Sequence, residues 1–556
     1  MKRGIMLMLF VAATFALASC GGGGGGGSGS TTVDGTGPAS EPTTEAAPAA
    51  ALSSLEFLTL DGALFVPGTN PVPKRFEVRA TFDRALNADE QAAAEAAAQL
   101  LDGKGTAIAG AFEWNADGTQ FVFSPSKSLG YKETGSFKVS DQQVPFTTVV
   151  RGDVNGDGVP DYMVGSPREP NALGPEAGAW YLYDGANPSH ALNKIIGTTP
   201  GERLGSVVAI AGDINADGYA DLMATSAPAG APWTVHVYSG KDFQEIFSTT
   251  SAADNSYGFS VAEAGDVDSD GYDDILTSAP LFTEGGVIEQ GRAWITGGAD
   301  IISSPPPHSL ARVLMMISGS SGDKMGVAVA GDADFNGNGI PDVLVGGAGK
   351  VQIVEFQNSA QPPILKELTG SGGSGTFGNS LAILGDITGD GLPDFAVGDF
   401  LERTVLIYDN AGTLIHTLIG MSDPSQWFGW KVAAVGDVND DGAADLAVSD
   451  PYADSVDLGL TDSGQVVIYD GAALAAKNTK IIREIWGSEN NMQLGSSLTA
   501  TGDRGSAGKS LIIVGAPYRG KGFVYLYNPS DWDHPGILMG PDGGIQFGYA
   551  LSGAAR

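Results

Sequence analysis

The sequence predicts an all-β protein in which a seven-bladed β-propeller follows a smaller β-domain. Three observations lead to this prediction. A nine-residue acidic loop recurs six times between residues 153 and 445. A hydrophobic residue followed by glycine stands eight residues before the loop in every unit except the first. Units of about 50 to 65 residues with several strands suit propeller blades packed around a ring. Seven units are opened by Gly-Asp dipeptides, which end at Asp153, Asp213, Asp266, Asp332, Asp386, Asp437 and Asp503.

The N-terminal segment has the pattern of an export signal. Basic residues at positions 2 and 3 precede an apolar stretch from Ile5 to Leu17, which is too short to span a membrane. The following Leu17-Ala18-Ser19-Cys20 resembles the bacterial lipobox, in which the cysteine is diacylated and becomes the mature N-terminus. That resemblance implies a lipoprotein signal peptide at residues 1–19 and a lipid anchor on Cys20, the single cysteine of the chain. An ordinary cleaved signal with an incidental cysteine is the alternative.

Residues 20–51 cannot build a folded core. Seven glycines follow Cys20, and a tract rich in Ser, Thr, Pro and Ala continues to about residue 50. A segment of this composition behaves as a flexible tether. Gly21, directly after the cysteine, resembles the outer-membrane sorting pattern of Gram-negative lipoproteins. We therefore expect a lipid-anchored protein of the bacterial cell envelope, at the outer membrane on its surface or periplasmic face.

Residues 52–148 predict a small β-sandwich. Side chains from 76 to 82 alternate between apolar and polar, which is the period of a half-buried strand, and a second such run covers 120–125. An alanine-rich stretch from Ala88 to Leu101 favours a short helix between them. The pattern around Phe82-Asp83-Arg84-Ala85-Leu86 resembles bacterial Ig-like domains of the surface-layer type. An unclassified β-sandwich is the alternative, and both imply a spacer or stalk.

One pattern repeats through residues 149–556. Each unit has a hydrophobic-Gly pair, a short strand, the acidic loop, a β-branched strand ending in a small-small-Pro turn such as Gly165-Ser166-Pro167, and an aromatic strand such as Trp180-Tyr181-Leu182-Tyr183. The pairs are Leu204-Gly205, Tyr257-Gly258, Met325-Gly326, Phe377-Gly378, Phe428-Gly429 and Leu494-Gly495. This pattern resembles the FG-GAP repeat of integrin α-subunit propellers and their bacterial relatives. The resemblance spans about 400 residues and implies an integrin-α-like propeller.

The two ends of the repeat region complement each other. The first unit has an acidic loop but no hydrophobic-Gly pair at the proper distance. The chain finishes with Phe547-Gly548-Tyr549-Ala550-Leu551-Ser552-Gly553, which is the missing half of a unit. We therefore expect a strand within residues 547–554 to complete the first blade and close the ring. Closure removes sheet edges that would otherwise invite aggregation.

The acidic loops offer the oxygen ligands that calcium requires. Positions 1, 3, 5 and 9 carry carboxylates, amides or a hydroxyl, position 7 offers a main-chain carbonyl, and glycine at position 6 permits a sharp turn. We expect six structural calcium ions, with acidic turns that hold no metal as the alternative. The predicted ligands are Asp153, Asn155, Asp157, Asp161, Asp213, Asn215, Asp217, Asp221, Asp266, Asp268, Asp270, Asp274, Asp334, Asn336, Asn338, Asp342, Asp386, Thr388, Asp390, Asp394, Asp437, Asn439, Asp441 and Asp445.

Two loops depart from this pattern. In the fourth unit two inserted residues move the start of the loop to Asp334, and two of its four ligands are neutral asparagines, so occupancy by metal is least expected there. The seventh loop begins at Asp503 but has lost its other acids. There Arg504 or Lys509 is expected to replace the ion as the local positive charge.

Composition and motifs exclude several classes of function. The 556 residues include 65 acidic and 30 basic ones, and the formal charge of −35 argues against nucleic acid as a partner. The five histidines are scattered without zinc spacing, and no Gly-x-Ser-x-Gly motif is present. No cysteine nucleophile remains after lipidation. We therefore expect a protein that is not an enzyme.

The resemblance also implies a function. In the integrin-like family the acidic loops lie on one propeller face and ligands dock on the other. We expect a monomeric, surface-tethered calcium-binding module that adheres to a protein or carbohydrate ligand, with segments 280–291 and 451–464 and Trp427 as candidate contacts. Two alternatives remain open: a structural scaffold of the envelope, and an accessory or catalytic propeller of a polysaccharide-degrading enzyme.

Overall fold

The computed structural model describes most of the chain beyond the predicted tether. Residues 50–556 form one compact unit. The predicted signal peptide, Cys20 and the tether up to residue 49 lie outside the described residues. None of the described helices is long and apolar enough to cross a membrane. Within 50–554 the description leaves out 61, 66, 68–71, 127, 251–255, 304–312, 358–361, 421–424 and 542–545.

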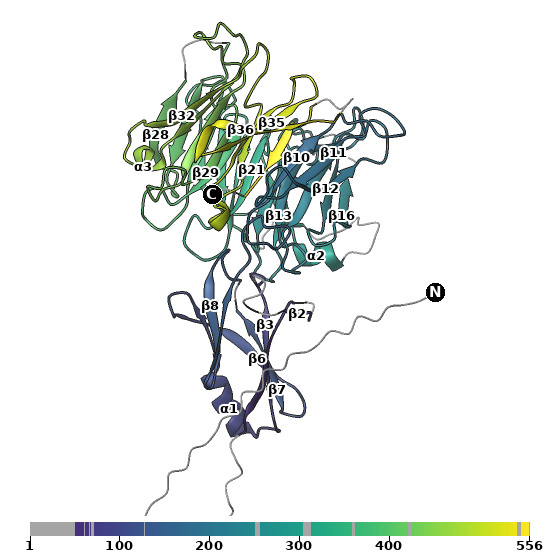
Figure 1. Cartoon of the computed structure of the whole chain (residues 1–556), viewed down its shortest axis with the longest axis vertical. Coiled ribbons are helices and arrows are strands. Elements are labelled where there is room, and N and C mark those ends of the chain that lie inside the picture. Colours follow the sequence, from purple (N-terminus) through teal and green to yellow (C-terminus); the bar gives the residue numbers. More distant parts are fainter. Residues whose placement is uncertain are drawn as a thin grey trace, which may run out of the picture. The chain divides into compact units, whose positions relative to one another are not determined.

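The first part of the described chain is a sandwich of two antiparallel sheets (Figure 1). One sheet comprises β1 (Leu52–Leu58), β2 (Leu64–Phe65), β3 (Glu77–Phe82), β6 (Gly110–Trp114) and β7 (Gln120–Pro125). The other comprises β4 (Gln99–Asp102), β5 (Ala107–Ile108), β8 (Thr134–Val139) and β9 (Gln142–Thr147). Side chains in β3 and β7 alternate between buried and half-buried, which confirms the alternation predicted for both strands. Their buried residues share one core with Phe57, Phe76 and Phe137.

The predicted helix is shorter than expected. Helix α1 covers Ala88–Ala97 and begins at a capping box, in which Asn87 accepts from the backbone of Glu90 and the Glu90 side chain accepts from Asn87 N–H. The prediction of helix up to Leu101 was wrong at this end. Leu100 is fully buried in the sandwich core and pairs with Phe137, so strand β4 replaces the last helical turn.

The repeat region contains seven four-stranded antiparallel sheets within its described residues, here called blades 1 to 7. Blade 1 comprises β10 (Tyr162–Ser166), β11 (Ala179–Tyr183), β12 (Ala191–Ile196) and β37 (Ala550–Ser552). Blades 2 to 4 comprise β13 (Leu204–Gly212), β14 (Asp221–Ser226), β15 (Thr234–Tyr238), β16 (Glu245–Thr250); β17 (Val261–Gly265), β18 (Asp274–Ala279), β19 (Arg292–Thr296), β20 (Val313–Ser318); and β21 (Ala328–Ala333), β22 (Asp342–Gly347), β23 (Lys350–Val354), β24 (Ile364–Thr369). Blades 5 to 7 comprise β25 (Ser380–Gly385), β26 (Asp394–Asp399), β27 (Thr404–Tyr408), β28 (Leu414–Ile419); β29 (Val432–Gly436), β30 (Asp445–Asp450), β31 (Gln465–Tyr469), β32 (Ile481–Trp486); and β33 (Ser497–Ala500), β34 (Ile512–Ala516), β35 (Phe523–Asn528), β36 (Asp531–Met539). Two short helices, α2 (Gly298–Ser303) and α3 (Gly471–Ala475), follow the third strands of blades 3 and 6.

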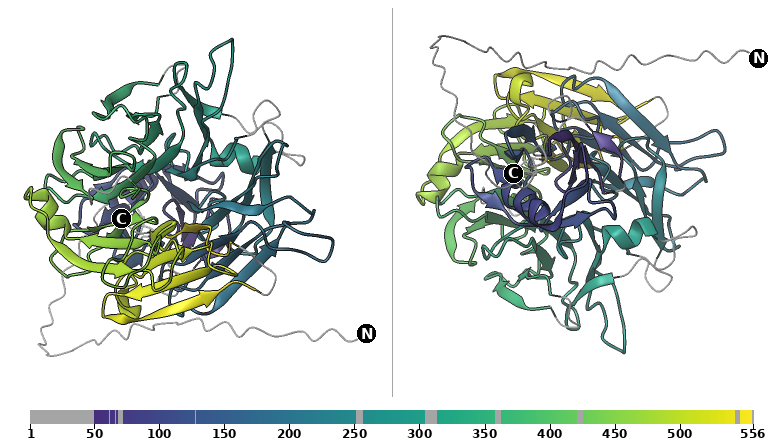
Figure 2. Two further views of the ribbon diagram at one scale, coloured as in Figure 1. Left: turned by 90° about the horizontal axis from the view of Figure 1, so that it is seen from above. Right: turned by 90° about the horizontal axis from the view of Figure 1, so that it is seen from below.

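The blades are arranged around a central axis (Figure 2). The innermost strands of all seven blades line one central cavity of about 290 Å³. Apolar clusters join neighbouring blades, and one cluster combines Tyr162 and Val164 of blade 1 with Ile513 and Val524 of blade 7. The ring is therefore packed continuously between its first and last blades.

The strand that completes blade 1 comes from the end of the chain. Strand β37 pairs antiparallel with β10, with Val164 opposite Leu551. Gly548 N–H donates to the carbonyl oxygen of Gly165 at 3.0 Å, and Phe547, which is 1% exposed, packs in the cluster between blades 1 and 7. The paired segment lies inside residues 547–554, where the sequence places the missing half of the first repeat.

Because neighbouring strands in each blade are antiparallel, successive connections between strands lie on alternate faces of the ring. The loop face carries the acidic loops, each of which leads into the second strand of its blade and, in blades 2 to 6, joins it to the first strand. The same face carries the links between third and fourth strands. The opposite face carries the links between second and third strands and those from a fourth strand to the next blade. Every acidic loop is thus presented on the same face.

Candidate metal centres

One hydrogen-bond pattern shapes all six acidic loops. The backbone N–H at position 6 donates to the Oδ2 atom of the position-1 aspartate, at distances between 2.7 Å for Gly339 and 3.1 Å for Gly271. Glycine at position 6 has a positive φ in each loop, between 84° at Gly158 and 99° at Gly271, which favours a residue without Cβ. The loops are therefore closed by their own side chains. The other four bonds of this kind join Gly158 to Asp153, Gly218 to Asp213, Gly391 to Asp386 and Gly442 to Asp437.

The position-9 aspartates begin the second strand of blades 2 to 6 or directly precede it in blade 1. Each is fully buried and accepts hydrogen bonds from the backbone at the start of its loop, as Asp274 does from Val267 N–H at 2.9 Å. In four loops the other carboxylate oxygen accepts from a glycine after the third strand of the same blade, such as Gly298. The same contact is made by Gly185 with Asp161, Gly240 with Asp221 and Gly471 with Asp445.

Burial makes these carboxylates costly to ionise. Desolvation raises the pKa of Asp161 to about 8, of Asp342 and Asp445 to about 7, and of Asp394 to about 6. Desolvation also raises the pKa of Asp221, Asp274 and the position-1 residue Asp213 well above the ordinary range. A cation in the loop would offset this cost, because an opposite charge favours the ionised carboxylate.

In two loops a carboxylate oxygen has no partner among the described residues. Asp266 Oδ1 in the third loop and Asp342 Oδ1 in the fourth are buried without a hydrogen bond to any described residue, although the two residues are only 7% and 0% exposed. A buried carboxylate oxygen is normally satisfied. Oxygen atoms from carboxylates, amides and backbone carbonyls form the donor set that a hard divalent cation prefers. The residues present therefore fit such an ion.

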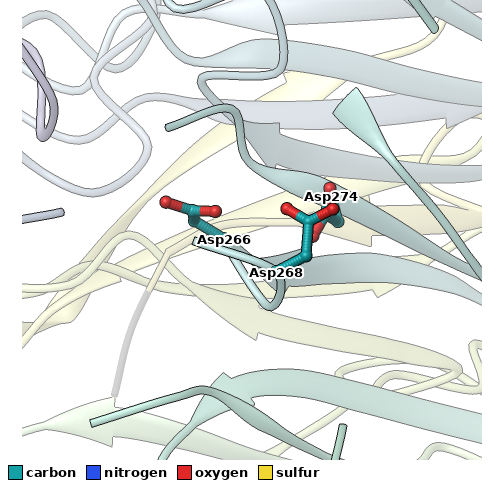
Figure 3. Close-up of side chains that lie close together, drawn as sticks. All are labelled: Asp266, Asp268 and Asp274. Carbon is teal, nitrogen blue, oxygen red and sulfur yellow. The ribbon is translucent and has the colours of Figure 1, made fainter. Parts of the chain in front are cut away.

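The third loop brings three predicted ligands together. One oxygen atom each of Asp266, Asp268 and Asp274 lies within 4.8 Å of the others, and the carboxylates of Asp268 and Asp274 lie side by side (Figure 3). Asp270 in the same loop has its pKa raised to about 6, first by desolvation and also by Asp268 and Asp266.

A second cluster of three includes one residue that the sequence analysis missed. Asp441 and Asp445 of the sixth loop lie within 4.8 Å of Asp470, which caps helix α3. An aspartate directly after the aromatic third strand also occurs at Asp184 and Asp409, and this recurrence is the signal that could have revealed it. Asp470 also contacts Lys480 Nζ at 2.5 Å, so a protein cation already compensates part of its charge.

Position-3 side chains contact position 9 in two loops and position 5 in a third. Asn215 Nδ2 donates to Asp221 at 3.3 Å, Thr388 Oγ1 donates to Asp394 at 3.5 Å, and Asn439 Nδ2 donates to Asp441 at 2.9 Å. In the fourth loop the position-5 residue Asn338 donates from Nδ2 to Glu355 at 2.8 Å. Asp334 accepts from Gly337, Asn338 and Gly339, and it therefore occupies position 1 as predicted from the two-residue insertion.

The seventh loop is neutralised differently from the prediction. Arg504 Nε donates to the Gly185 carbonyl of blade 1 at 2.8 Å, and Lys509 Nζ contacts Asp440 of the sixth loop at 2.6 Å. Asp503 is paired with Lys132 of the sandwich at 2.7 Å. The expectation that Arg504 or Lys509 supplies the charge within this loop was therefore wrong, because both side chains reach neighbouring blades.

Metal-free protein is expected to lose stability as the pH rises from about 4 to about 8. The position-9 aspartates have an ordinary pKa of about 4 in the unfolded chain and a raised pKa in the folded one. The folded chain then binds more protons than the unfolded chain over this interval, so the free energy of unfolding falls as the pH rises. Melting temperatures of metal-free protein at pH 5, 6, 7 and 8 test this. A melting temperature that rises with pH would contradict it.

Comparison with known proteins identifies the repeats. A family model described as an FG-GAP-like repeat matches residues 153–224, 213–277 and 334–397, and the FG-GAP repeat model matches 428–469. Each of these segments contains at least one acidic loop. The matched segments carry the same order of first strand, acidic loop and second strand that the structure shows.

Curated relatives include integrin α-subunits. Mouse integrin alpha-8 is 28% identical over 285 residues, which cover 46% of this chain and 26% of that protein. Human integrin alpha-IIb is 34% identical over 145 residues, which cover 23% of this chain and 14% of that protein. Chicken integrin alpha-V is 29% identical over 36% of this chain and 20% of that protein. The chain therefore spans about a quarter or less of the length of these relatives.

A solved periplasmic gluconolactonase from Pseudomonas aeruginosa shows only a remote likeness. Its structure aligns with a TM-score of 0.43 at 13% identity, over 71% of this chain and 97% of that chain. A likeness at this level carries no argument about activity. The repeat matches, the integrin α relatives and the ring of four-stranded sheets instead show that the chain carries FG-GAP repeats in a β-propeller.

Proposed function

We propose that this protein is a calcium-stabilised, lipid-anchored propeller that binds a protein or carbohydrate ligand at its opposite face and does not act as an enzyme. The observation that carries this proposal is a rigid aromatic cluster on the opposite face. The acidic loops supply stability on the loop face, where each bound calcium ion would offset buried carboxylate charge.

The aromatic cluster combines side chains from three connections. The ring of Trp427 lies 4.4 Å from Tyr452, 5.0 Å from Phe400 and 5.2 Å from Trp430, measured between centroids. All four side chains are half-buried. Phe400 follows the second strand of blade 5, Tyr452 follows that of blade 6, and both tryptophans lie between these blades. Aromatic side chains supply large contact areas at low entropic cost, which suits a binding surface.

Hydrogen bonds hold this cluster in place. Asp450, which is buried, accepts from the backbone N–H groups of Trp427 at 2.9 Å and Tyr452 at 3.1 Å. Trp430 Nε1 donates to the Ser496 carbonyl at 3.0 Å and thereby reaches the connection to blade 7. A surface that is ordered before binding loses less entropy when a ligand docks.

Further apolar side chains extend the same face. The segments 280–291 and 451–464, predicted as contacts, both link second to third strands there. Leu281 and Ile288 are 50% and 63% exposed in the first segment, and Val456 and Leu458 are 86% and 62% exposed in the second. Exposed apolar groups in such number are typical of an interaction surface. By contrast, the loop face is contacted by the sandwich, through Lys132 and Asp503 among other pairs.

The anchoring part of the proposal rests on the N-terminal sequence. A lipid on Cys20 and a tether up to residue 51 would hold a monomeric propeller at the outer membrane, facing the surface or the periplasm. Radiolabelled palmitate incorporation that depends on Cys20, with Cys20→Ala as the comparison, tests the anchor independently of ligand binding.

Removal of the aromatic cluster is expected to weaken ligand binding by tenfold or more. Buried aromatic anchors commonly contribute about 2 kcal/mol or more at an interface, so Trp427→Ala and Tyr452→Ala should each reduce affinity for the ligands selected by wild-type protein on glycan and envelope-protein arrays. Trp233→Ala is the matched control, because Trp233 stacks on Phe259 at 6.1 Å on the same face near blade 2. Equal losses in all three variants, or none, would contradict a ligand site at this cluster.

One observation favours a second, enzymatic candidate. Ser226 Oγ lies 3.0 Å from His236 Nε2, and His236 Nδ1 lies 3.3 Å from Glu245, beside a cavity of about 270 Å³. This order of groups can activate a serine for acyl transfer. Glu202 lies 3.3 Å from the same hydroxyl, however, and its negative charge opposes the oxyanion that the reaction must form. A fluorophosphonate that labels wild-type protein but not Ser226→Ala would place this candidate first.

A further inference from the structure

The third acidic loop is in direct contact with the sandwich. Ser128 Oγ donates to Asp266 Oδ2 of position 1 at 2.5 Å, and Arg75 Nη1 donates to the Ser269 carbonyl of position 4 at 2.7 Å. A Cβ added to Gly271 at position 6 would lie 2.7 Å from Leu60 and 2.9 Å from Arg75. The sandwich therefore packs against this loop at three of its positions.

The other loops provide an internal comparison. A Cβ at position 6 meets nothing within 4 Å in the first, fourth, fifth and sixth loops, at Gly158, Gly339, Gly391 and Gly442. In the second loop Gly218 faces Pro73 of the sandwich, but at 3.4 Å. Among the described residues, the closest contact of the sandwich with an acidic loop is thus at the third loop.

The two carboxylate oxygens of Asp266 have different surroundings. Its Oδ2 atom accepts from Ser128 and from Gly271 N–H, whereas its buried Oδ1 atom accepts no hydrogen bond from the part of the chain that the structure describes. Oδ1 is therefore the Asp266 oxygen left for an ion. One oxygen atom of Asp266 lies within 4.8 Å of one oxygen atom each of Asp268 and Asp274 (Figure 3). Ser128 and Gly271 together hold the Oδ2 side of this carboxylate.

A buried ionic group reinforces the same contact. Lys74 Nζ of the sandwich lies 2.5 Å from Asp273 Oδ1 at position 8 of the third loop. Asp273 Oδ2 in turn accepts from Asp213 N–H at 2.8 Å, which links the third loop to the second. Tyr131 bonds to Glu263 through its hydroxyl, and its ring lies 4.1 Å from Lys74 Nζ and 4.5 Å from Arg151. The sandwich thereby contacts both position 8 of the third loop and the strand β17 that precedes this loop.

We propose that Ser128 is a positioning residue for the cation of the third loop, and that docking of the sandwich and binding of this one ion are coupled. The inference rests on the calcium-binding part of the proposed function. Outer partners that orient a metal ligand commonly change metal affinity by about tenfold to a hundredfold. Coupling is reciprocal, so the ion strengthens docking by the same factor by which docking strengthens ion binding. The first, fourth, fifth and sixth loops, where a Cβ at position 6 would meet no described atom within 4 Å, bind their ions independently of the sandwich.

The test compares two contacts between the sandwich and the loop face. Ser128→Ala removes the hydroxyl at Asp266, whereas the control Lys132→Ala removes the exposed pair with Asp503, the one acid that the seventh loop retains. Calcium titration by calorimetry should show one site weakened by about tenfold or more in Ser128→Ala and unchanged affinities in Lys132→Ala. Ser128→Thr, which retains a hydroxyl, should restore the site.

Hydrogen exchange measures the reciprocal effect. Calcium should slow exchange of backbone amides in residues 72–75 and 128–132 of the wild-type sandwich, and this protection should shrink in Ser128→Ala. Calcium binding with identical affinities in wild type and Ser128→Ala, or with no change in exchange of these segments, would overturn the coupling while leaving the calcium sites intact. Absence of calcium binding in every variant would overturn the calcium part of the proposed function and the coupling with it.

Discussion

Deletion of residues 547–556 is expected to destabilise the whole propeller by about 5 kcal/mol or more. The deletion removes strand β37, leaves β10 with an unpaired edge, and takes Phe547 out of the cluster that joins blades 1 and 7. Loss of a buried phenylalanine alone costs about 3–5 kcal/mol. Urea unfolding followed by tryptophan fluorescence measures the change, and unchanged unfolding of the shortened chain would contradict ring closure by this strand.

Two substitutions distinguish the loss of ring closure from a general effect of altering the C-terminal segment. Phe547 is 1% exposed, so Phe547→Ala should reproduce much of the loss. Tyr549 belongs to the same segment but is 40% exposed, so Tyr549→Ala should cost little. Similar destabilisation by both variants would mean that the interblade packing of Phe547 is not the cause.

Removal of calcium is expected to lower the melting temperature by about 10 °C or more. Each ion present at about a hundred times its dissociation constant stabilises the folded state by about 2.7 kcal/mol, and six such ions act together. The metal-free chain also retains buried aspartates such as Asp221 and Asp274, whose pKa is raised by desolvation. Differential scanning calorimetry at neutral pH, with excess calcium and with chelator, measures the shift.

Magnesium and a variant of the seventh loop serve as controls. Magnesium prefers a smaller octahedral site and keeps its water ligands, so it should stabilise much less than calcium. Asp503→Asn alters the loop that has lost its acids and should leave the calcium-dependent shift unchanged. Equal melting temperatures with calcium and chelator would contradict structural ions in the loops.

Much of the fold could be predicted because its signals are local and repeated. The acidic loops, the hydrophobic-Gly pairs and the aromatic strands each fall within a few residues, and their recurrence marks the FG-GAP pattern that the family models confirm. The predicted position 1 of the fourth loop at Asp334 follows from the same spacing and agrees with its hydrogen bonds. The end of α1 was misjudged because burial of Leu100 in the sandwich core overrides the helix propensity of the alanines before it.

The residues that come together in each site were harder to predict, because they are brought into contact from segments far apart in the sequence. Ser128 and Asp266 are 138 positions apart, and no local pattern connects them. Phe400, Trp430 and Tyr452 join Trp427 only after blades 5 and 6 pack together. Their position in the sequence led to the prediction that Arg504 or Lys509 acts within the seventh loop. In the closed ring blade 7 lies between blades 1 and 6, and the two side chains contact those blades instead.

The measurement that tests the central claim most directly is the number of calcium ions bound per folded chain. Native mass spectrometry of residues 52–556, purified with calcium and then dialysed against metal-free buffer, counts the ions that remain. The arrangement of the acidic loops predicts six ions, and five in a variant that carries both Asp266→Asn and Asp274→Asn. A wild-type chain that folds into the same propeller without binding any calcium would contradict the account.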